Sequence, residues 1–470
     1  MRKTKLICTI GPSCSDEKTI TEMIQAGMNV ARLNFSHGTH DEHRKRINMI
    51  RKISEQLQIP VAVMLDTKGP EYRIKTFKNG KIHLCDGDSF TFTTRDIEGD
   101  RDIVSVNYAG LADELSPGDN ILLDNGLLIF EVEKVSGSEI LCRVTAGGDL
   151  SDRKSMSFPG KVLKQTYLSE QDKQDLLFGI ENGVDYIACS FVSCRQDLLD
   201  VKKFLHENRS DQIELIAKIE NQSGVDNIDE ICKECDGIMV ARGDMGVEIS
   251  FDQLPAIQKM LITKCRMLGK RVITATEMLE TMIRNPRPTR AEISDVANAV
   301  YDGTSAVMLS GETAAGKYPV LSVQTMARIA EQTENNIHYQ KRFRSYEFVI
   351  KNTVDAISHA TCGMSIDINA KAIVVCTLSG MTARMVSRFR SPVDILAVTA
   401  NKKTFRKLAL SWGVTPVVCE MYESTDVLFY KAKKLAKETF NLKKGDKIII
   451  TGGMTNGVSG NTNILKIETI

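Results

Sequence analysis

Short apolar runs recur along the chain, and most of them precede a stretch with helical spacing. Runs this short, bounded by polar residues, are typical of buried strands in a parallel sheet. Alternating strands and helices predict a parallel sheet, and eight such units close a (β/α)8 barrel. The runs that fit are 4–10, 28–36, 61–67, 186–192, 214–221, 237–244, 271–278 and 306–313.

The segment 72–167 interrupts this pattern after the third run. Its short β-type segments are divided by DGD, PGDN, SGS and AGGD turns, which is typical of a small all-β barrel. Because a barrel has its active site at the C-terminal ends of its strands, this insertion is expected to act as a lid. We therefore predict a barrel formed by 1–71 and 168–345, an inserted β-barrel over 72–167, and a third part over 346–470.

The third part contains a second alternating series of strands and helices. Five strand candidates predict an open, mostly parallel α/β sheet with its own ligand loops. The segment TLSGMTAR at 377–384 follows the first of them and opens a helix, where hydroxyls and N–H groups can hold a phosphate. The candidates are 371–377, 394–399, 414–419, 446–453 and 464–470.

Composition is that of an ordinary globular protein. The 470 residues have room for about three domains of roughly 150 residues each. A net charge of +1 leaves no basic excess for nucleic acid or for a membrane surface, so neither is an expected partner. No apolar run approaches the length of a membrane-spanning helix, and the 12 scattered Cys suit reduced thiols, so we expect a cytoplasmic protein.

Candidate chemistry begins with three charged residues at the ends of two neighbouring runs. Lys218 and Glu220 share one face of a strand because side chains alternate with a period of two. The next strand brings Asp244 beside them, and carboxylate oxygens are ligands for Mg²⁺ or Mn²⁺. The pattern favours a metal and phosphoryl site. A structural ion-pair network is the alternative, although burying three charges is costly without a compensating ion.

Polar residues also follow the other barrel runs, and the barrel topology gathers them at one mouth. Arginines among them offer paired donors for phosphate or carboxylate. These residues are Arg32, Asn34, Ser36, Asp66, Thr67, Ser190, Thr276, Ser310 and Glu312, with Arg73 just beyond the third run.

The chain resembles the pyruvate kinase family, and its bacterial members in particular, over its whole length. The resemblance implies the same three parts, namely a (β/α)8 A domain, a β-barrel B domain and a C domain with an allosteric site. The motifs that carry it are CTIGP at 8–12, ARLNFSHG at 31–38, LDTKGPEYR at 65–73, KIENQ at 218–222, MVARGDMGVE at 239–248, TATEM at 274–278, NPRPTRAE at 285–292 and MLSGETAAGKYP at 308–319.

The resemblance implies transfer of a phosphoryl group from phosphoenolpyruvate to ADP, giving ATP and pyruvate in glycolysis. Lys218 matches the lysine that stabilises the transferring group, and Glu220 and Asp244 match the Mg²⁺ or Mn²⁺ ligands. Thr276, and with it Ser310, matches the proton relay to the enol. The remaining matches are Arg32 and Arg73 for phosphate, the Ala241, Arg242, Gly243 and Asp244 backbone for the substrate carboxylate, Asn34, Ser36, Asp66 and Thr67 for K⁺, and His37 and Lys154 near the nucleotide.

Regulation and assembly are also implied by the resemblance. Glu71 stands where K⁺-dependent members carry a glutamate. Two C-domain segments match the family's sugar-phosphate effector site, with the effector left open between fructose 1,6-bisphosphate, AMP and sugar monophosphates. A homotetramer is expected. The effector-site matches are Thr377, Ser379, Gly380, Thr382, Gly457 and Gly460.

Some positions depart from the family pattern. Ser155 and Phe158 replace commoner glycine and leucine in the lid, and Asn125 replaces an aspartate there. Glu277 replaces a glutamine, and Ser305 stands where many members have Asp, beside a helix expected at a subunit contact. Two functions outside this family were also considered, a metal-dependent barrel lyase or aldolase acting on pyruvate-like substrates and a non-catalytic sugar-phosphate sensor.

Overall fold

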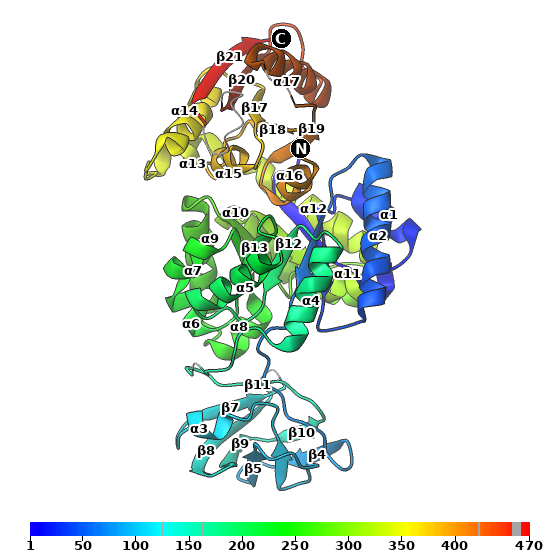
Figure 1. The fold of residues 1–470 in the computed structure, drawn as a ribbon, viewed down its shortest axis with the longest axis vertical. Helices are drawn as coiled ribbons and strands as arrows, with labels where there is room; N and C mark the ends of the chain where they lie inside the picture. The colour runs from blue at the N-terminus through cyan, green and yellow to red at the C-terminus, as the bar shows by residue number, and fades with distance from the viewer. Residues whose placement is uncertain (125, 162, 422–423, 454–461) are drawn as a thin grey trace.

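The computed structural model describes the whole chain except residues 125, 162, 422–423 and 454–461. Figure 1 shows three parts in a row. The barrel lies in the middle, the inserted β part lies at one end, and the C-terminal α/β part lies at the other end with the N-terminus beside it. The residue boundaries given above for these parts stay predictions.

The barrel is closed by eight parallel strands, which confirms the predicted fold class. Continuous apolar runs form these strands because each is buried on both faces, as the burial of every residue from Lys5 to Thr9 illustrates. In barrel order the strands are β1 (Lys5–Thr9), β16 (Ala306–Leu309), β15 (Arg271–Ala275), β14 (Gly237–Ala241), β13 (Glu214–Ile219), β12 (Tyr186–Cys189), β3 (Ala62–Asp66) and β2 (Val30–Asn34).

Most of the strands end several residues before the predicted runs do. The run 237–244 leaves the sheet at Ala241 because the chain passes directly into helix α8 (Arg242–Glu248). The run 271–278 leaves it at Ala275, because the next two residues have positive φ angles that no strand tolerates. Polar residues such as Thr67, Glu220 and Thr276 therefore lie in the loops at the barrel mouth, whereas Asn34 and Asp66 are the last residues of their strands.

Helices surround the barrel and bury their apolar faces against the strands. Several begin with a capping box, as at Thr39 with Glu42, Ser169 with Asp172 and Thr289 with Glu292. Besides α8, they are α1 (Glu17–Gln25), α2 (His40–Leu57), α4 (Glu170–Glu181), α5 (Arg195–Glu207), α6 (Gln222–Asp226), α7 (Ile228–Glu234), α9 (Leu254–Met267), α10 (Arg290–Asp302), α11 (Gly311–Ala314) and α12 (Pro319–Asn335).

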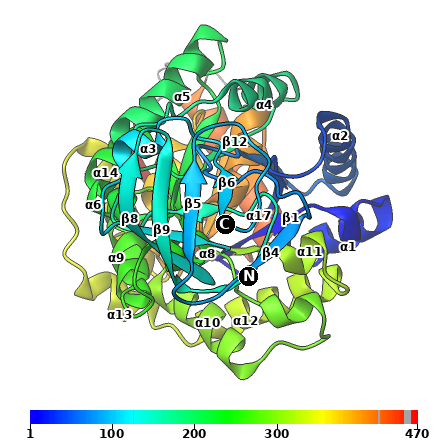
Figure 2. The same ribbon diagram turned by 90° about the horizontal axis from the view of Figure 1, so that it is seen from below.

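The inserted part is all-β apart from one short helix, α3 (Leu111–Glu114), as predicted. Its described strands form two sheets around one core rather than a single closed ring, in the orders β11-β7-β8-β9-β5-β6 and β10-β4. Figure 2 shows this part in front of the barrel. The strands are β4 (Lys81–Leu84), β5 (Ser89–Thr93), β6 (Ile103–Ser105), β7 (Asn120–Leu123), β8 (Leu128–Ser136), β9 (Glu139–Ala146), β10 (Gly148–Ser151) and β11 (Met156–Ser157).

The C-terminal part is the predicted open sheet, in the order β19-β18-β17-β20-β21. Among the described strands of this sheet, only β21 runs antiparallel to its neighbour. Its elements are α13 (Tyr339–Ser345), α14 (Thr353–Asp367), β17 (Ala372–Cys376), α15 (Met381–Ser387), β18 (Asp394–Thr399), α16 (Lys402–Lys407), β19 (Val414–Val418), α17 (Thr425–Phe440), β20 (Lys447–Gly452) and β21 (Ile464–Thr469).

This C-terminal sheet docks on the base of the barrel, where the strands begin. Lys3 pairs with Asp394 at 2.6 Å, and Arg406 pairs with Asp185, just before β12, at 2.9 Å. The mouth of the barrel is therefore left to the inserted part. Within the described part of the chain, no helix combines the length and the apolar character needed to cross a bilayer.

Candidate functional site

Lys218 on β13 is the centre of a buried charge cluster at the barrel mouth. Its Nζ lies 3.1 Å from Asp66 Oδ1 and donates to Ser190 Oγ at 2.7 Å. The same ammonium lies 3.1 Å from Glu220 Oε1. Since residues of β3, β12 and β13 converge here, the parallel topology brings together groups that are far apart in the sequence.

Arg32 on β2 extends this cluster. Its Nε donates to Asp66 Oδ2 at 2.6 Å, and its Nη1 donates to Thr9 Oγ1 at 2.9 Å. Asp66 is only 1% exposed, so its carboxylate is held between two cations away from water. Of the residues predicted from the sequence, Arg32, Asp66, Lys218 and Glu220 are thus brought into one contact network.

Electrostatics differ sharply within the network. Burial alone would raise the pKa of Asp66, but Arg32 and Lys218 lower it below its ordinary value. Burial likewise opposes the charge of Lys218, yet Asp66 and Glu220 raise its pKa above the ordinary value. For Glu220, burial dominates and raises the pKa to about 7, in spite of Lys218. Of the three ionised groups, the negative charge of Glu220 is therefore the least stabilised by its surroundings.

Glu220 has one carboxylate oxygen available for a ligand. Its Oε2 accepts the N–H of Phe191 at 2.6 Å, whereas the fully buried Oε1 has no hydrogen-bond partner within the described residues. Asp244, on α8, is exposed at the mouth. No group of three or more His, Cys, Asp or Glu side chains suited to a metal occurs in the described ranges. Two carboxylates fit Mg²⁺ or Mn²⁺ when substrate oxygens and water complete the shell.

The loop after β15 is strained at the mouth. Thr276 has φ +72° and Glu277 has φ +55°, and a positive φ is a true outlier for a β-branched residue. A Cβ added to Gly243 would lie 2.8 Å from Thr276 Cγ2, so the start of α8 and this loop are in close approach. The side chain of Arg242 holds the loop, donating to Thr276 O at 2.6 Å and pairing with Asp295 at 2.7 Å.

Ser310 lies at the end of β16, beside the same mouth. Its N–H donates to the buried carboxylate of Glu312 at 2.7 Å, and the Leu279 N–H donates to the other oxygen of Glu312 at 3.0 Å. Glu312 therefore orders the loops that carry Ser310 and Thr276, and burial raises its pKa.

The candidate K⁺ ligands lie along the ends of β2 and β3. Asn34 Oδ1 accepts the Ser36 N–H at 3.1 Å. Thr67 Oγ1 donates to the Ala188 carbonyl at 3.3 Å. The carboxylate of Asp66 is bound by Arg32 and Lys218. The side-chain oxygens of Asn34, Asp66 and Thr67 therefore already have hydrogen-bond partners, although each retains a further lone pair that a cation could use. His37, three residues after the strand, is exposed.

The nucleotide-side candidates belong to the inserted part and its entry. Arg73 contacts Glu71 through Nη2 and donates from Nη1 to the Arg153 carbonyl at 2.6 Å. Lys154 pairs with Asp124 at 2.8 Å. Neither side chain touches the Lys218 cluster. Arg73 and Asp244 nevertheless line one cleft of about 350 Å³ between the inserted part and the mouth.

The candidate effector site in the C-terminal part is partly described. Thr377 Oγ1 accepts the Gly380 N–H at 3.0 Å, and Gly380 has φ +84°, which favours glycine. Thr382 Oγ1 lies 2.6 Å from Thr462 Oγ1. Ser379 is in the same loop. Gly457 and Gly460 lie outside the described residues.

Ser190 and Phe191 are two further site residues: the sequence places Ser190 at the mouth without a role, and it does not indicate Phe191. Ser190 Oγ donates to the Thr67 carbonyl at 2.7 Å and accepts from Lys218, so it joins β3 to β13. Phe191, with φ +55°, aims its N–H at Glu220. The sequence signal for Ser190 is its position at the end of a barrel run. Phe191 contributes only its backbone N–H, which every residue except proline has, so the sequence carries no signal for it.

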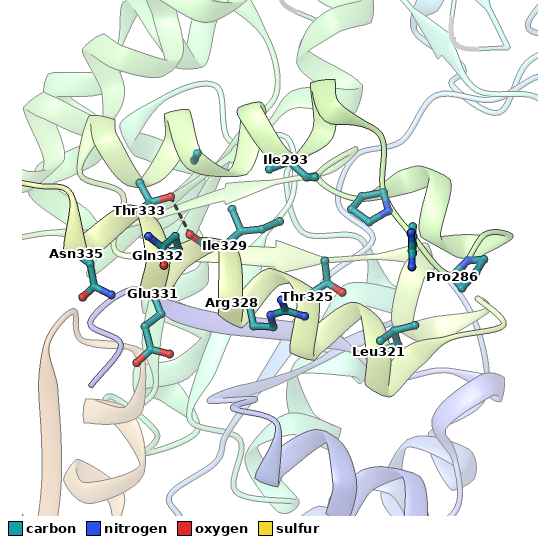
Figure 3. Close-up of a pocket in the computed structure, with 13 residues that line it drawn as sticks. Pro286, Ile293, Leu321, Thr325, Arg328, Ile329, Glu331, Gln332, Thr333 and Asn335 are labelled. Atoms are coloured by element: carbon teal, nitrogen blue, oxygen red, sulfur yellow. Dashed lines mark hydrogen bonds between the residues drawn. The ribbon is translucent and has the colours of Figure 1, made fainter.

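A larger cavity, of about 1100 Å³, lies away from the mouth between α10 and α12. Figure 3 shows Pro286 at one end of it and Asn335 at the other, with Ile293 above the α12 side chains. Its walls contain none of the mouth residues, so size alone does not identify the functional site.

A (β/α)8 barrel with cations and carboxylates buried beneath an inserted β part defines a barrel enzyme of the phosphotransferase class. Family models agree. The model for the pyruvate kinase barrel domain matches residues 1–323, and that for the pyruvate kinase alpha/beta domain matches residues 355–468. The chain belongs to the pyruvate kinase family.

Curated relatives and a solved structure give the same result. The pyruvate kinase of Clostridium acetobutylicum is 46% identical, with 100% of both chains covered. That of Staphylococcus saprophyticus is 47% identical over 100% of this chain and 81% of its own. A solved pyruvate kinase from Cryptosporidium parvum has a TM-score of 0.94 at 38% identity, covering 100% of this chain and 96% of that one.

Proposed function

We propose that this protein transfers the phosphoryl group of phosphoenolpyruvate to ADP in glycolysis, in the cytoplasm. An oxygen of the ADP β-phosphate attacks phosphorus, the bond from phosphorus to the enol oxygen breaks, and the enolate that leaves takes up one proton at carbon to give pyruvate. The observation that carries the proposal is the Lys218 ammonium, buried between Asp66 and Glu220 at the mouth.

Lys218 and Arg32 are the cations assigned to the phosphoryl group. Phosphoryl transfer depends on positioning and on electrostatic stabilisation more than on covalent help. Asp66 contacts both cations and so fixes their positions before substrate arrives. This arrangement supports a site organised for a phosphoryl group whose charge is spread over three oxygens, since the donors need no reorganisation during transfer.

Glu220 and Asp244 are the residues that would hold Mg²⁺ or Mn²⁺. Glu220 Oε1 supports this assignment, since it accepts no hydrogen bond among the described residues and has the Lys218 ammonium 3.1 Å away as an ion-pair partner. When bound, the divalent ion supplies positive charge that offsets the charge of the phosphoryl oxygens. Phe191 orients the Glu220 carboxylate through its N–H, which leaves the second oxygen beside the Lys218 ammonium.

Asn34, Ser36, Asp66 and Thr67 are the residues assigned to K⁺, and Glu71 is the reason to expect dependence on it. The second carboxylate oxygen of Glu71, Oε2, has no hydrogen-bond partner in the part of the chain that is described. Replacing K⁺ by a large organic cation at constant ionic strength is expected to remove most of the turnover. Unchanged turnover would contradict the role given to Glu71.

Thr276 and Ser310 are assigned to proton delivery at the enol carbon. The strained Thr276 backbone supports a functional role, because strain of this kind persists where the surrounding structure imposes it. The backbone N–H groups from Ala241 to Asp244 are assigned to the substrate carboxylate. The absence of a Cβ at Gly243 supports this, since it permits the close approach of the two loops.

His37, Arg73 and Lys154 are assigned to the nucleotide. Their position on the inserted part, or on the loop facing it, supports binding between the lid and the mouth. In the C-terminal part, Thr377, Ser379, Gly380 and Thr382 are assigned to a phosphorylated effector, and the protein is proposed to be a homotetramer.

A coupled assay with phosphoenolpyruvate, ADP, Mg²⁺ and K⁺ tests the activity directly. ATP and pyruvate should form in equal amounts. A metal-dependent lyase or aldolase would consume pyruvate-like substrates without forming ATP, and a sensor would bind sugar phosphates without turnover. Titration of the same assay with fructose 1,6-bisphosphate, AMP and ribose 5-phosphate identifies the effector.

A further inference from the structure

A small cavity lies between the base of the barrel and the C-terminal part, beside the first residues of β15 and β16. No acidic side chain lines it within the described part of the chain, and burying like charges together is costly unless negative charge compensates them. The cationic side chains in its wall are Arg266, Lys270, Arg271, Arg384, Arg388 and Arg390.

Four of these cations have partners outside the cavity wall. Three of them pair with carboxylates and Lys270 donates to a carbonyl, so the presence of these four alone requires no ligand. The partners are Glu214 for Arg271, Asp236 for Arg384, Asp355 for Arg388 and the Cys235 carbonyl for Lys270.

Arg266 and Arg390 have no acidic partner within the described residues. They are 2% and 4% exposed. Arg390 donates from Nη2 to the Gly303 carbonyl at 3.1 Å and to Ser305 Oγ at 3.0 Å. Arg266 lies over the Tyr346 ring at 4.1 Å. These contacts satisfy some donors and supply no full negative charge.

Several donors of the pair remain unused. Arg266 Nε and Nη2, and Arg390 Nε, are buried without a hydrogen-bond partner in the described chain. Burial, and after it the neighbouring Arg266, lowers the pKa of Arg390 to about 9. Burial thus destabilises the positive charge of Arg390, and no neighbouring side chain among the described residues supplies enough negative charge to compensate it.

The size of the cavity decides between ligands. Its volume is about 10 Å³, which is room for one particle the size of a water molecule. Chloride, a single spherical ion, is closer to that size than phosphate or sulfate, and water brings no charge. We propose that one chloride ion occupies this cavity, bound by the unused N–H groups of Arg266 and Arg390, and that it ties the barrel to the C-terminal part.

Ser305 offers a direct way to replace the ion. Its Oγ lies in the cavity wall, accepts the Val272 N–H at 3.2 Å and contacts Arg390. A carboxylate at this position would keep both contacts and supply the missing charge from within the chain.

Thermal unfolding of the full-length protein tests the proposal. Chloride replaces gluconate stepwise, while the pH, the K⁺ concentration and the ionic strength stay constant. The wild-type midpoint should rise by about 2–4 °C and then level off as the site fills. Ser305→Asp should show no response to chloride. Ser116→Asp, which adds the same charge at an exposed position of the inserted part, should keep the wild-type response.

Two results would overturn the proposal: a wild-type midpoint that ignores chloride, or a Ser305→Asp midpoint that follows it as closely as the wild type does. Crystals soaked in bromide provide a second measurement that needs no variant. An anomalous peak between Arg266 and Arg390 is expected. Density there without an anomalous signal would mean a water molecule and would also overturn the proposal.

Discussion

Two glutamates at opposite ends of β13 have pKa values that are shifted in opposite directions. Glu214 begins the strand at the base, and Glu220 follows its last residue at the mouth. Both are buried. Burial alone would raise the pKa of Glu214, but Arg271, Arg384 and Lys407 lower it to about 2. Burial raises the pKa of Glu220 to about 7, since Lys218 only partly compensates.

The difference separates structural charge from functional charge. At the base, Glu214 lies 2.5 Å from Arg271 and 3.1 Å from Lys407, so one carboxylate joins the barrel to the C-terminal part. At the mouth, Glu220 keeps an oxygen without a hydrogen-bond partner among the described residues. A buried oxygen without a hydrogen-bond partner is typical of a functional site, where a bound ligand supplies the missing contact.

The largest effect on activity is expected from removing the Lys218 ammonium at the barrel mouth. Lys218→Met should lower kcat by about 10³-fold, because a preorganised charge facing the transferring group is lost. Binding of Mn²⁺, followed by its paramagnetic effect on water relaxation, should persist because Glu220 and Asp244 remain. Near-wild-type turnover would show that Lys218 has another role.

Lys5→Met is the matched control at the base. Lys5 is also buried in the barrel, and its Nζ donates to the Val414 carbonyl at 2.8 Å. Burial, and after it Arg2, lowers the pKa of Lys5 to about 7. Exchange for an apolar side chain of similar size is expected to leave kcat unchanged. Equal losses of kcat in the two variants would remove the distinction between mouth and base.

A smaller loss of activity is expected from the strained loop at the mouth. Thr276→Ala should lower kcat by about 10²-fold, the lower range for a positioned proton donor or acceptor. Thr276→Ser retains the hydroxyl and should recover most of the turnover. Solvent deuterium exchange into pyruvate, measured with the coupled rate, checks whether proton delivery is the affected step. Equal rates for the alanine and serine variants would exclude a role for the hydroxyl.

Glu214→Gln tests the base through stability. The substitution leaves Arg271 and Lys407 without their carboxylate, which should cost about 3–5 kcal/mol in the free energy of unfolding. Because the folded pKa of Glu214 is lowered to about 2, its stabilisation is present above the unfolded value of about 4.3 and is lost as the pH falls toward 2. Urea titrations at several pH values should therefore show the difference from wild type shrinking in acid.

Glu220→Gln is the control for that measurement. An amide oxygen still accepts the Phe191 N–H, and Lys218 keeps Asp66, so the free energy of unfolding should change by less than about 1 kcal/mol. Metal affinity should fall roughly 10²-fold in the same variant. If Glu220→Gln destabilised the protein as much as Glu214→Gln, both glutamates would be structural.

The barrel was predictable because its strands are buried on both faces and therefore read as continuous apolar runs. The ends of the runs were less predictable. Thr276 leaves the sheet through a positive φ angle that its residue type does not signal. The pairing of the inserted strands into two sheets depends on register between distant segments, which alternation of side chains does not determine.

At the site, the spacing of Lys218 and Glu220 was enough to place both on one face of a strand. Ser190 and Phe191 were not assigned, because their contacts cross from β12 to neighbouring strands and one of them uses a backbone N–H. The docking role of Glu214 was equally hidden, since Lys407 lies far along the chain, in the C-terminal part.

The smallest effect is expected on the lid, where Lys154 and Lys75 form partly exposed ion pairs at 2.8 Å with Asp124 and Asp96. Replacing either lysine by Met should change the free energy of unfolding by less than about 1 kcal/mol, because partly solvated pairs contribute little. Only Lys154→Met should raise the KM for ADP, by roughly three- to tenfold, the equivalent of one lost charged contact. Equal KM values in the two variants would remove Lys154 from the nucleotide site and confine the functional charge to the mouth itself.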